Sequence, residues 1–226
     1  PMSAHHASPA GSPASGFRDW LTARGAAGPI STDDLLQTLL PLARDVAAIH
    51  LEGKVVEWNG VESVASIDGR LRLRADVATT PKRNLPGLPA IESADRGGVE
   101  LAGEFTARVL ETDDARAIVA GPLEEVLPIA RLGSEIERPV YLDQNRNWEE
   151  AIGHHDPVTD LFSLGMIFAS AACGLDFAGF AALERFVRHR RSLFDLNPGL
   201  HPVVAKAIVR MTELERRRRP QEVSAL

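Results

Sequence analysis

The feature that most constrains the fold is the apolar run LFSLGMIFASAACGL at residues 161 to 175. Asp156-Pro157 before it suit the N-cap and the first helical position, and Gly174 suits the C-terminal cap. The run is shorter than the roughly 20 apolar residues that a membrane-spanning helix needs, and acidic residues flank it. The pattern therefore predicts a buried helix from Asp156 to Gly174.

Helical patterns also occur on both sides of this run. FRDWLTARG has apolar residues on one side and ends in a glycine, which is typical of a short amphipathic helix. STDDLLQTLLPLARDVAAIH has Ser31 or Thr32 as its N-cap and leucines at helical spacing, so it predicts a long core helix. The complete set of expected helices is 17–25, 31–50, 156–174, 178–190, about 201–214, a short one ending at Gly133 and one from near Pro220.

The β-structure is predicted mainly between residues 50 and 73, which read as strand, loop and strand. Asp68-Gly69 between alternating apolar residues is a strong signal for a hairpin turn. Residues 79–98 are rich in proline, glycine and charge and read as a loop. Farther on, 98–111 and 115–121 either pair as strands or form a helix.

Length and composition favour one domain after a short leader. The chain has 226 residues, of which 44% are hydrophobic, and this suffices for a single core. Residues 1–16 contain almost nothing to bury and are expected to be a disordered leader, which leaves 17–226 as the domain. The net charge of -6 gives no general attraction to nucleic acid or anionic membranes. Cys173 is the one cysteine, so an internal disulfide is excluded and a cytoplasmic location is expected.

The order of these segments, together with DPVTDLFSLGMIFASAACG and HPVVAKAIVRMTELERRRRPQEV, resembles the C-terminal lobe of eukaryotic-type protein kinases over most of 17–226. The most specific pieces are Asp160 before the Phe-Ser-Leu-Gly run and the late pair Arg219-Pro220. The resemblance implies a mainly α (α+β) fold, a helical bundle with one or two small β-hairpins. It gives His50, Asp160 and Arg219 structural roles, and it expects Asp160 to brace the loop near residues 56 to 58.

The same resemblance implies that the catalytic groups of a kinase are missing. It places Val56, Glu57 and Trp58 at the His-Arg-Asp motif, so that Trp58 stands at the catalytic aspartate. An indole has only a donor N–H and cannot accept the substrate proton. The other degenerate positions are Gly60 and Ser63 at the loop lysine and asparagine, Ala75 at the aspartate of Asp-Phe-Gly with Asp76 one position later, and Asn145 at the glutamate expected to pair with Arg219.

An active kinase also needs a strand-rich N-terminal lobe with a glycine-rich loop, and the sequence has neither. We therefore expect no enzyme activity, no cofactor and no metal ion. The interpretation is a pseudokinase-like module that acts as a protein-interaction, scaffolding or regulatory domain of a larger polypeptide. Its partner would be another protein or downstream domains of the same chain, and segments of it resemble the N-terminal regions of large bacterial helicase or ATPase proteins.

Two alternatives stay open at this point. One is an atypical ATP-dependent kinase that receives its other lobe from a partner and uses Asp76, Glu57 or Asp68. The other is a nucleic-acid-binding adaptor that uses the arginine runs at 188–191 and 215–219, although a solvated helix end is the favoured interpretation of Arg216 to Arg218. Trp58 and Trp148 are equally compatible with core packing and partner contact, and His154-His155-Asp156 reads as a helix start rather than a metal site.

Overall fold

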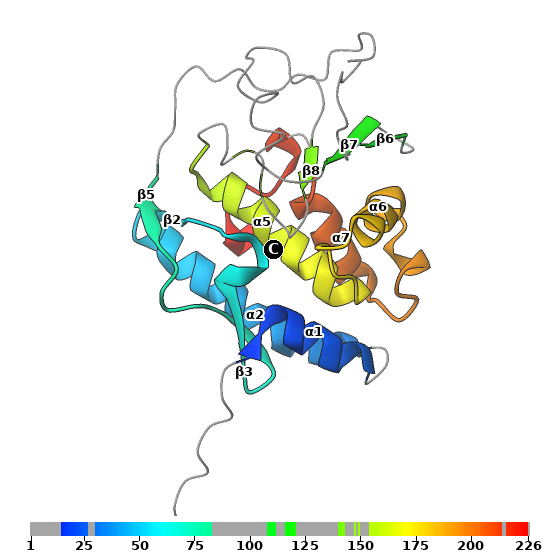
Figure 1. The fold of residues 1–226 in the computed structure, drawn as a ribbon. Coiled ribbons are helices and arrows are strands. Elements are labelled where there is room, and N and C mark those ends of the chain that lie inside the picture. The colour runs from blue at the N-terminus through cyan, green and yellow to red at the C-terminus, as the bar shows by residue number, and fades with distance from the viewer. Residues whose placement is uncertain are drawn as a thin grey trace, which may run out of the picture.

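The computed structural model describes residues 15–26, 30–82, 108–111, 116–120, 140–142, 147, 149, 154–213 and 216–225. Its described part is mixed α/β, with five α-helices and three small sheets (Figure 1). The helices are α1 (Phe17–Ala26), α2 (Thr32–Leu51), α5 (Pro157–Cys173), α6 (Phe180–His189) and α7 (Pro202–Met211).

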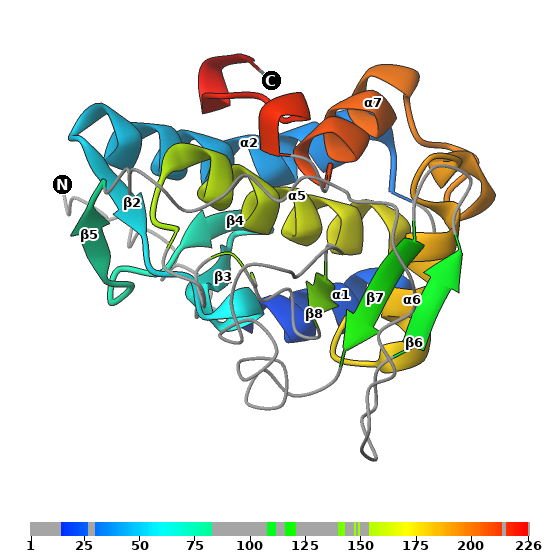
Figure 2. The ribbon, with the colours of Figure 1, turned by 90° about the horizontal axis from the view of Figure 1, so that it is seen from above.

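Helix α5 crosses the middle of the molecule, and α2 and α7 pack against it (Figures 1 and 2). All its residues from Thr159 to Ala172 are buried, as expected for a helix that is apolar on every side. The side chain of Asp156 accepts a hydrogen bond from the Thr159 N–H, and Gly174 ends the helix at a φ of 65°. This predicted helix is confirmed. In the described ranges, we find no helix with the length and apolar character needed to cross a membrane.

The contact between α5 and α7 depends on a glycine. A Cβ atom added to Gly165 would lie 2.6 Å from the Cβ of Met211, which is closer than real Cβ contacts allow. Glycine at this position therefore lets the two helices approach one another closely.

Helix α2 begins after Ser31, whose hydroxyl accepts a hydrogen bond of 3.1 Å from the Asp34 N–H. Of the two predicted N-caps, Ser31 is the one used. The buried leucines of α2, among them Leu35, Leu39 and Leu42, belong to the core that surrounds α5. Helix α1 is also confirmed, and it packs near the first strands.

The predicted hairpin is formed by β3 (Val64–Ile67) and β4 (Arg70–Leu73). Asp68 and Gly69 connect them with φ values of 51° and 76°, the left-handed pair that a tight hairpin turn requires. On its other edge, β3 pairs with β1 (Ser15–Gly16). The last two residues of the predicted leader are therefore a strand, while 1–14 lie outside the described residues.

The prediction for residues 50–73 is wrong in the pairing of its first strand, β2 (Lys54–Val56). This strand does not continue into a hairpin with β3 but pairs with β5 (Thr79–Pro81), which lies in a segment predicted to be loop. Strands of three residues are too short to show an alternating pattern, so their pairing could not be recognised locally. The loop between β2 and β3 contains one 3-10 turn, Gly60–Ser63.

A third sheet contains β6 (Arg108–Glu111), β7 (Arg116–Ala120) and β8 (Val140–Leu142). Strands β6 and β7 are antiparallel and β7 and β8 are parallel, so the strand interpretation of this region holds over the helical one. Helix α6 lies against β6 and β7 (Figure 2). The helix expected to end at Gly133 falls outside the described residues.

The helix predicted from Pro220 is wrong for the described residues, which form two 3-10 turns, Arg216–Arg218 and Val223–Ala225. The side-chain amide of Gln221 donates hydrogen bonds to the carbonyls of Arg216 and Arg219. The Arg216 carbonyl also accepts a 3.1 Å bond from the Arg219 backbone N–H, as in a 3-10 turn, and Pro220 has no N–H with which to continue an α-helix.

Candidate functional site

The loop after β2 is fastened to α5 through the buried carboxylate of Asp160. This carboxylate accepts hydrogen bonds from the Val56 backbone N–H at 2.9 Å and from the Trp58 indole Nε1–H at 3.1 Å. Nε2 of His50, in the last turn of α2, lies 2.8 Å from Oδ2 of Asp160, the oxygen that also accepts from Val56. We call these four residues the loop anchor. The resemblance expects Asp160 to brace the loop near residues 56 to 58, and Asp160 accepts hydrogen bonds from two residues of this loop.

The electrostatics of the loop anchor are dominated by burial. Removal from water raises the pKa of Asp160, and the hydrogen bonds from His50, Val56 and Trp58 oppose that rise. The three residues that contact Asp160 belong to three elements: His50 to α2, Val56 to β2 and Trp58 to the following loop. One carboxylate therefore fixes the end of α2, the end of β2 and the following loop relative to α5.

Trp58 belongs to the hydrophobic core, with only 8% of its surface exposed. Its N–H is used by Asp160, and its ring lies among the residues that pack on α5. The structure thus gives Trp58 the core role of its two predicted alternatives. Trp148 lies outside the described residues.

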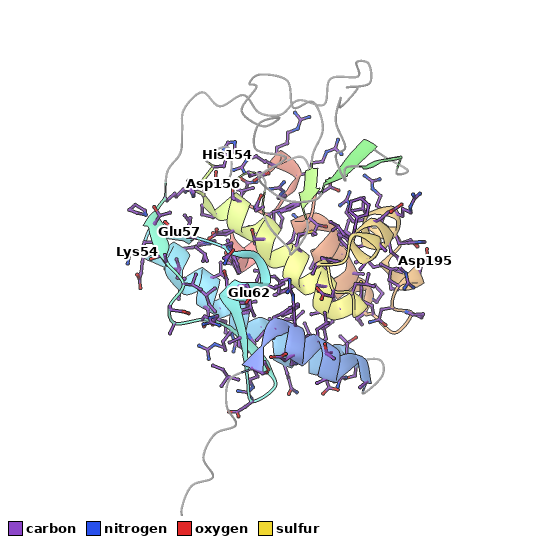
Figure 3. All side chains as sticks on the ribbon, viewed as in Figure 1. Lys54, Glu57, Glu62, His154, Asp156 and Asp195 are labelled. Carbon is purple, nitrogen blue, oxygen red and sulfur yellow. The ribbon has the colours of Figure 1, made fainter. Side chains whose placement is uncertain are left out.

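The remaining predicted loop positions also have structural roles. The Ser63 hydroxyl is buried and accepts a 2.7 Å hydrogen bond from the Asn59 N–H, while Gly60 begins the turn with a φ of 54°. Glu57 and Glu62 belong to the same loop and are exposed (Figure 3). None of these groups is presented beside Asp160 as a second carboxylate or a cation.

Ala75 and Asp76 lie in the turn after β4 and are exposed. The Asp76 carboxylate is 3.0 Å from Nε of Arg74, and this hydrogen bond lowers the pKa of Asp76. Asp68 is a turn residue. Asp76 and Asp68 thus have roles in turns, and the described ranges contain no group of three His, Cys, Asp or Glu residues arranged to hold a metal ion.

A second buried polar group lies at the start of α5, where Figure 3 shows His154 and Asp156. Glu149 is fully buried, and its Oε1 is 2.7 Å from Nη2 of Arg219. Arg216 donates to the other oxygen of Glu149 and, at 2.5 Å, to Oδ2 of Asp156. We call Glu149, Asp156, Arg216 and Arg219 the arginine cluster.

The arginine cluster corrects two predictions. The resemblance places Asn145 at the glutamate that would pair with Arg219, whereas the structure pairs Arg219 with Glu149. Asn145 itself is outside the described residues. Arg216 was expected at a solvated helix end, but its guanidinium lies within the cluster and only Arg217 and Arg218 are exposed. Glu149 lies in a stretch without periodicity, so the need of a buried arginine for a carboxylate was the one available signal.

Arg219 is held on every side. Its guanidinium lies 4.5 Å from the ring centre of Phe162, a cation–π distance, and it also donates to the carbonyl of Glu213. Arg219 thus contacts α5 through the Phe162 ring and contacts the buried acid Glu149, which precedes that helix. This places Arg219 as a structural residue.

Arginines of the first run, 188–191, also form ion pairs with carboxylates. Arg188 is 2.6 Å from Glu184 one turn earlier, and Arg190 is buried and 3.3 Å from Glu213. These ion pairs reduce the positive charge that the run offers to a phosphate backbone.

A scan against models of known protein families finds no match to this chain, and a search of curated proteins finds none.

Proposed function

We propose that this chain is a non-catalytic, pseudokinase-like module that works by binding protein partners or other domains of a larger polypeptide. The observation that carries the proposal is the state of Trp58. The resemblance assigns the catalytic aspartate to this position, and here a buried indole donates its N–H to Asp160. Since an indole has no basic lone pair to offer, this position does not activate a hydroxyl nucleophile.

Three further contacts support the kinase-lobe resemblance. His50 and the loop backbone meet at Asp160, and Arg219 meets a buried glutamate. The β3–β4 pair is one of the small hairpins that the resemblance implies. The residues that it assigns to structure are thus engaged, while the positions that it assigns to chemistry hold other groups.

The two alternatives are less well supported. An atypical kinase would use Asp76, Glu57 or Asp68, but Asp76 is bound to Arg74 and Asp68 forms the hairpin turn. A nucleic-acid adaptor would need open guanidinium groups, and Arg188, Arg190 and Arg216 are paired with carboxylates. We therefore keep the binding module as the one proposal.

The test is the thermal stability of the chain with ATP and Mg²⁺. A ligand at 100 times its Kd stabilises a protein by about 2.7 kcal/mol, which a melting experiment detects easily. We expect no stabilisation and no transfer of phosphate to a generic protein substrate. Stabilisation by ATP and Mg²⁺ that Asp76→Asn abolishes would instead favour the atypical kinase. Capture of a defined partner by the chain would then identify what the module binds.

A further inference from the structure

A cavity of about 340 Å³ opens beside the first turn of α5. Its walls come from three distant parts of the sequence, namely Lys82 after β5, residues 156 to 158, and the turn that carries Arg216, Arg217 and Gln221. It lies at the end of the molecule where β5 is found, and Figure 3 shows Asp156 there, on the far side from Asp195. A space of this size fits a small ligand or a single side chain of a partner.

The lining of the cavity is cationic. The lining contains three cations, Lys82, Arg216 and Arg217, and one carboxylate, Asp156, so it carries a formal charge of +2. Both oxygens of Asp156 are already used within the protein, since Oδ2 accepts from Arg216 and Oδ1 accepts from the Thr159 N–H at 3.0 Å. The acid in the wall is thus bound to the fold and its charge is balanced by Arg216.

Lys82 supplies the ammonium group of the site. Its backbone N–H is fixed by a 3.0 Å hydrogen bond to the Gly53 carbonyl, and its side chain is exposed. Within the part of the chain that the structure describes, Lys82 forms no ion pair. Arg217 takes part in a further contact of the fold, so the test below relies on Lys82.

The pKa of His154, which lies near Asp156 (Figure 3), is lowered. Burial lowers the pKa of His154 first, and the charge of Arg216 lowers it next, ahead of the opposing effects of Glu149 and Asp156. The charge of Arg216 thus adds to the effect of burial in favouring a neutral imidazole.

We propose that this cavity binds a phosphate monoester. Such a group carries about -1.5 to -2 charges at pH 7, opposite in sign to the lining, and an ammonium group such as that of Lys82 is a usual donor to its oxygens. Arg216 is already bound to Glu149 and Asp156, so it contributes charge to the site. Pro157 and Val158 provide an apolar wall for the carbon group that bears the ester. The site is separate from the loop anchor and does not depend on the function proposed above.

The experiment is an NMR titration of the full ¹⁵N-labelled chain with O-phosphoserine, inorganic phosphate and a phosphoserine peptide. Serine and the unphosphorylated peptide are the controls. We expect the phosphate-bearing compounds to shift the amide signals of Lys82, Val158 and Gln221. We expect Lys82→Ala to weaken binding roughly tenfold, the effect of losing one hydrogen bond to a charged group.

The matched control is Lys206→Ala. Lys206 is an exposed lysine on α7, a helix that lies away from β5 (Figures 1 and 2), and we expect less than about a twofold effect there, as for an exposed charge remote from the site. Both variants replace an exposed side chain, and their melting temperatures check that they fold.

The proposal would be overturned if the amide signals at the cavity did not shift with phosphate-bearing compounds up to about 10 mM, above the Kd of weak ligands. It would also be overturned if Lys82→Ala and Lys206→Ala weakened phosphate binding equally, or if serine bound as tightly as O-phosphoserine. If the peptide binds more tightly than O-phosphoserine, the source is a phosphorylated protein. If the two bind equally, it is a small phosphorylated molecule. Both results support phosphate recognition, and neither bears on ATP at the loop anchor.

Discussion

The loop anchor and the arginine cluster meet about one turn apart at the start of α5, through Asp160 and the N-cap residue Asp156, yet they hold carboxylates in different ways. Asp160 is held by a backbone N–H, an indole and an imidazole, whereas Glu149 and Asp156 are held by guanidinium groups. Donors of the first kind fix where the loop lies but neutralise little charge. Guanidinium groups neutralise the acids and join the segment around Glu149 to α5 and the last turns.

The pKa values follow this difference. Burial raises the pKa of Asp160, and its hydrogen bonds do not reverse the shift. Burial acts in the same direction on Asp156, but there the charge of Arg216 and the Thr159 N–H lower the pKa by more. The ionised form of Asp160, in the first turn of α5, thus costs stability, whereas the ionised form of the N-cap Asp156 contributes stability.

The largest effect is expected for Arg219→Met. Removing one partner of a buried pair leaves an uncompensated charge on Glu149, and we expect a loss of about 3–5 kcal/mol in the free energy of unfolding measured with urea. Arg210→Met, at an exposed position on α7, is the control and should change this energy by less than about 0.5 kcal/mol. A loss below about 1 kcal/mol for Arg219→Met would mean that Arg216 alone compensates Glu149.

A smaller loss is expected for Asp160→Asn. The new amide group places an N–H donor against groups that are themselves donors, so we expect a loss of about 1–3 kcal/mol in urea unfolding and a shift of the Trp58 indole signal in NMR spectra. Glu57→Gln, an exposed change in the same loop, is the matched control. If both variants were equally stable, Asp160 would not be the residue that holds the loop.

Next is Trp58→Phe, which keeps an aromatic ring but removes the donor to Asp160. We expect a loss of about 1–2 kcal/mol, because one buried oxygen of Asp160 loses its partner. Trp20→Phe is the comparison, since Trp20 is buried in the same core and makes no side-chain hydrogen bond among the described residues. If Trp58→Phe lowered the free energy of unfolding by less than Trp20→Phe, the hydrogen bond from Trp58 to Asp160 would not contribute to stability.

The smallest effect is a change in pH dependence for Asp156→Asn. Because the pKa of Asp156 is below its ordinary value of 3.8, its carboxylate stabilises the fold above pH 3.8, and this contribution disappears as the pH falls through the lowered pKa. Asparagine is an equally good N-cap, so the variant should lose less stability than the native chain between about pH 4 and pH 2.

Asp160→Asn should act in the opposite sense in the same acid titration. The pKa of Asp160 is raised, so the native chain loses stability as the pH rises from 3.8 through the raised pKa, and the variant lacks this fall. Parallel curves for the two variants would contradict the contrast between the loop anchor and the arginine cluster.

The parts of the fold that the sequence predicted are those whose signals are local. Asp156, Pro157 and Gly174 mark both ends of α5, and Asp68-Gly69 marks the hairpin, because capping and turn chemistry involve neighbouring residues. The pairing of β2 with β5 and the 3-10 turns after α7 depend on contacts made elsewhere in the chain. They had no local signal.

The candidate site divides in the same way. The positions of Asp160 and Trp58 came from a resemblance in sequence order, but the burial of Trp58 and its hydrogen bond required the structure. Glu149 was missed as the partner of Arg219 because a long stretch of chain separates the two residues. The cavity near Lys82 could not be predicted, since three segments must come together to form it.

The pairing of β2 with β5 around the β3–β4 hairpin has a consequence for how the chain folds. The inner hairpin closes a two-residue turn, and once it has formed, the outer pair needs to close a much shorter effective loop. The hydrogen bond between Val56 and Asp160 spans 104 residues and therefore belongs to the slowest class of contacts. We expect this region to assemble from the inner hairpin outward and to lock when α5 docks.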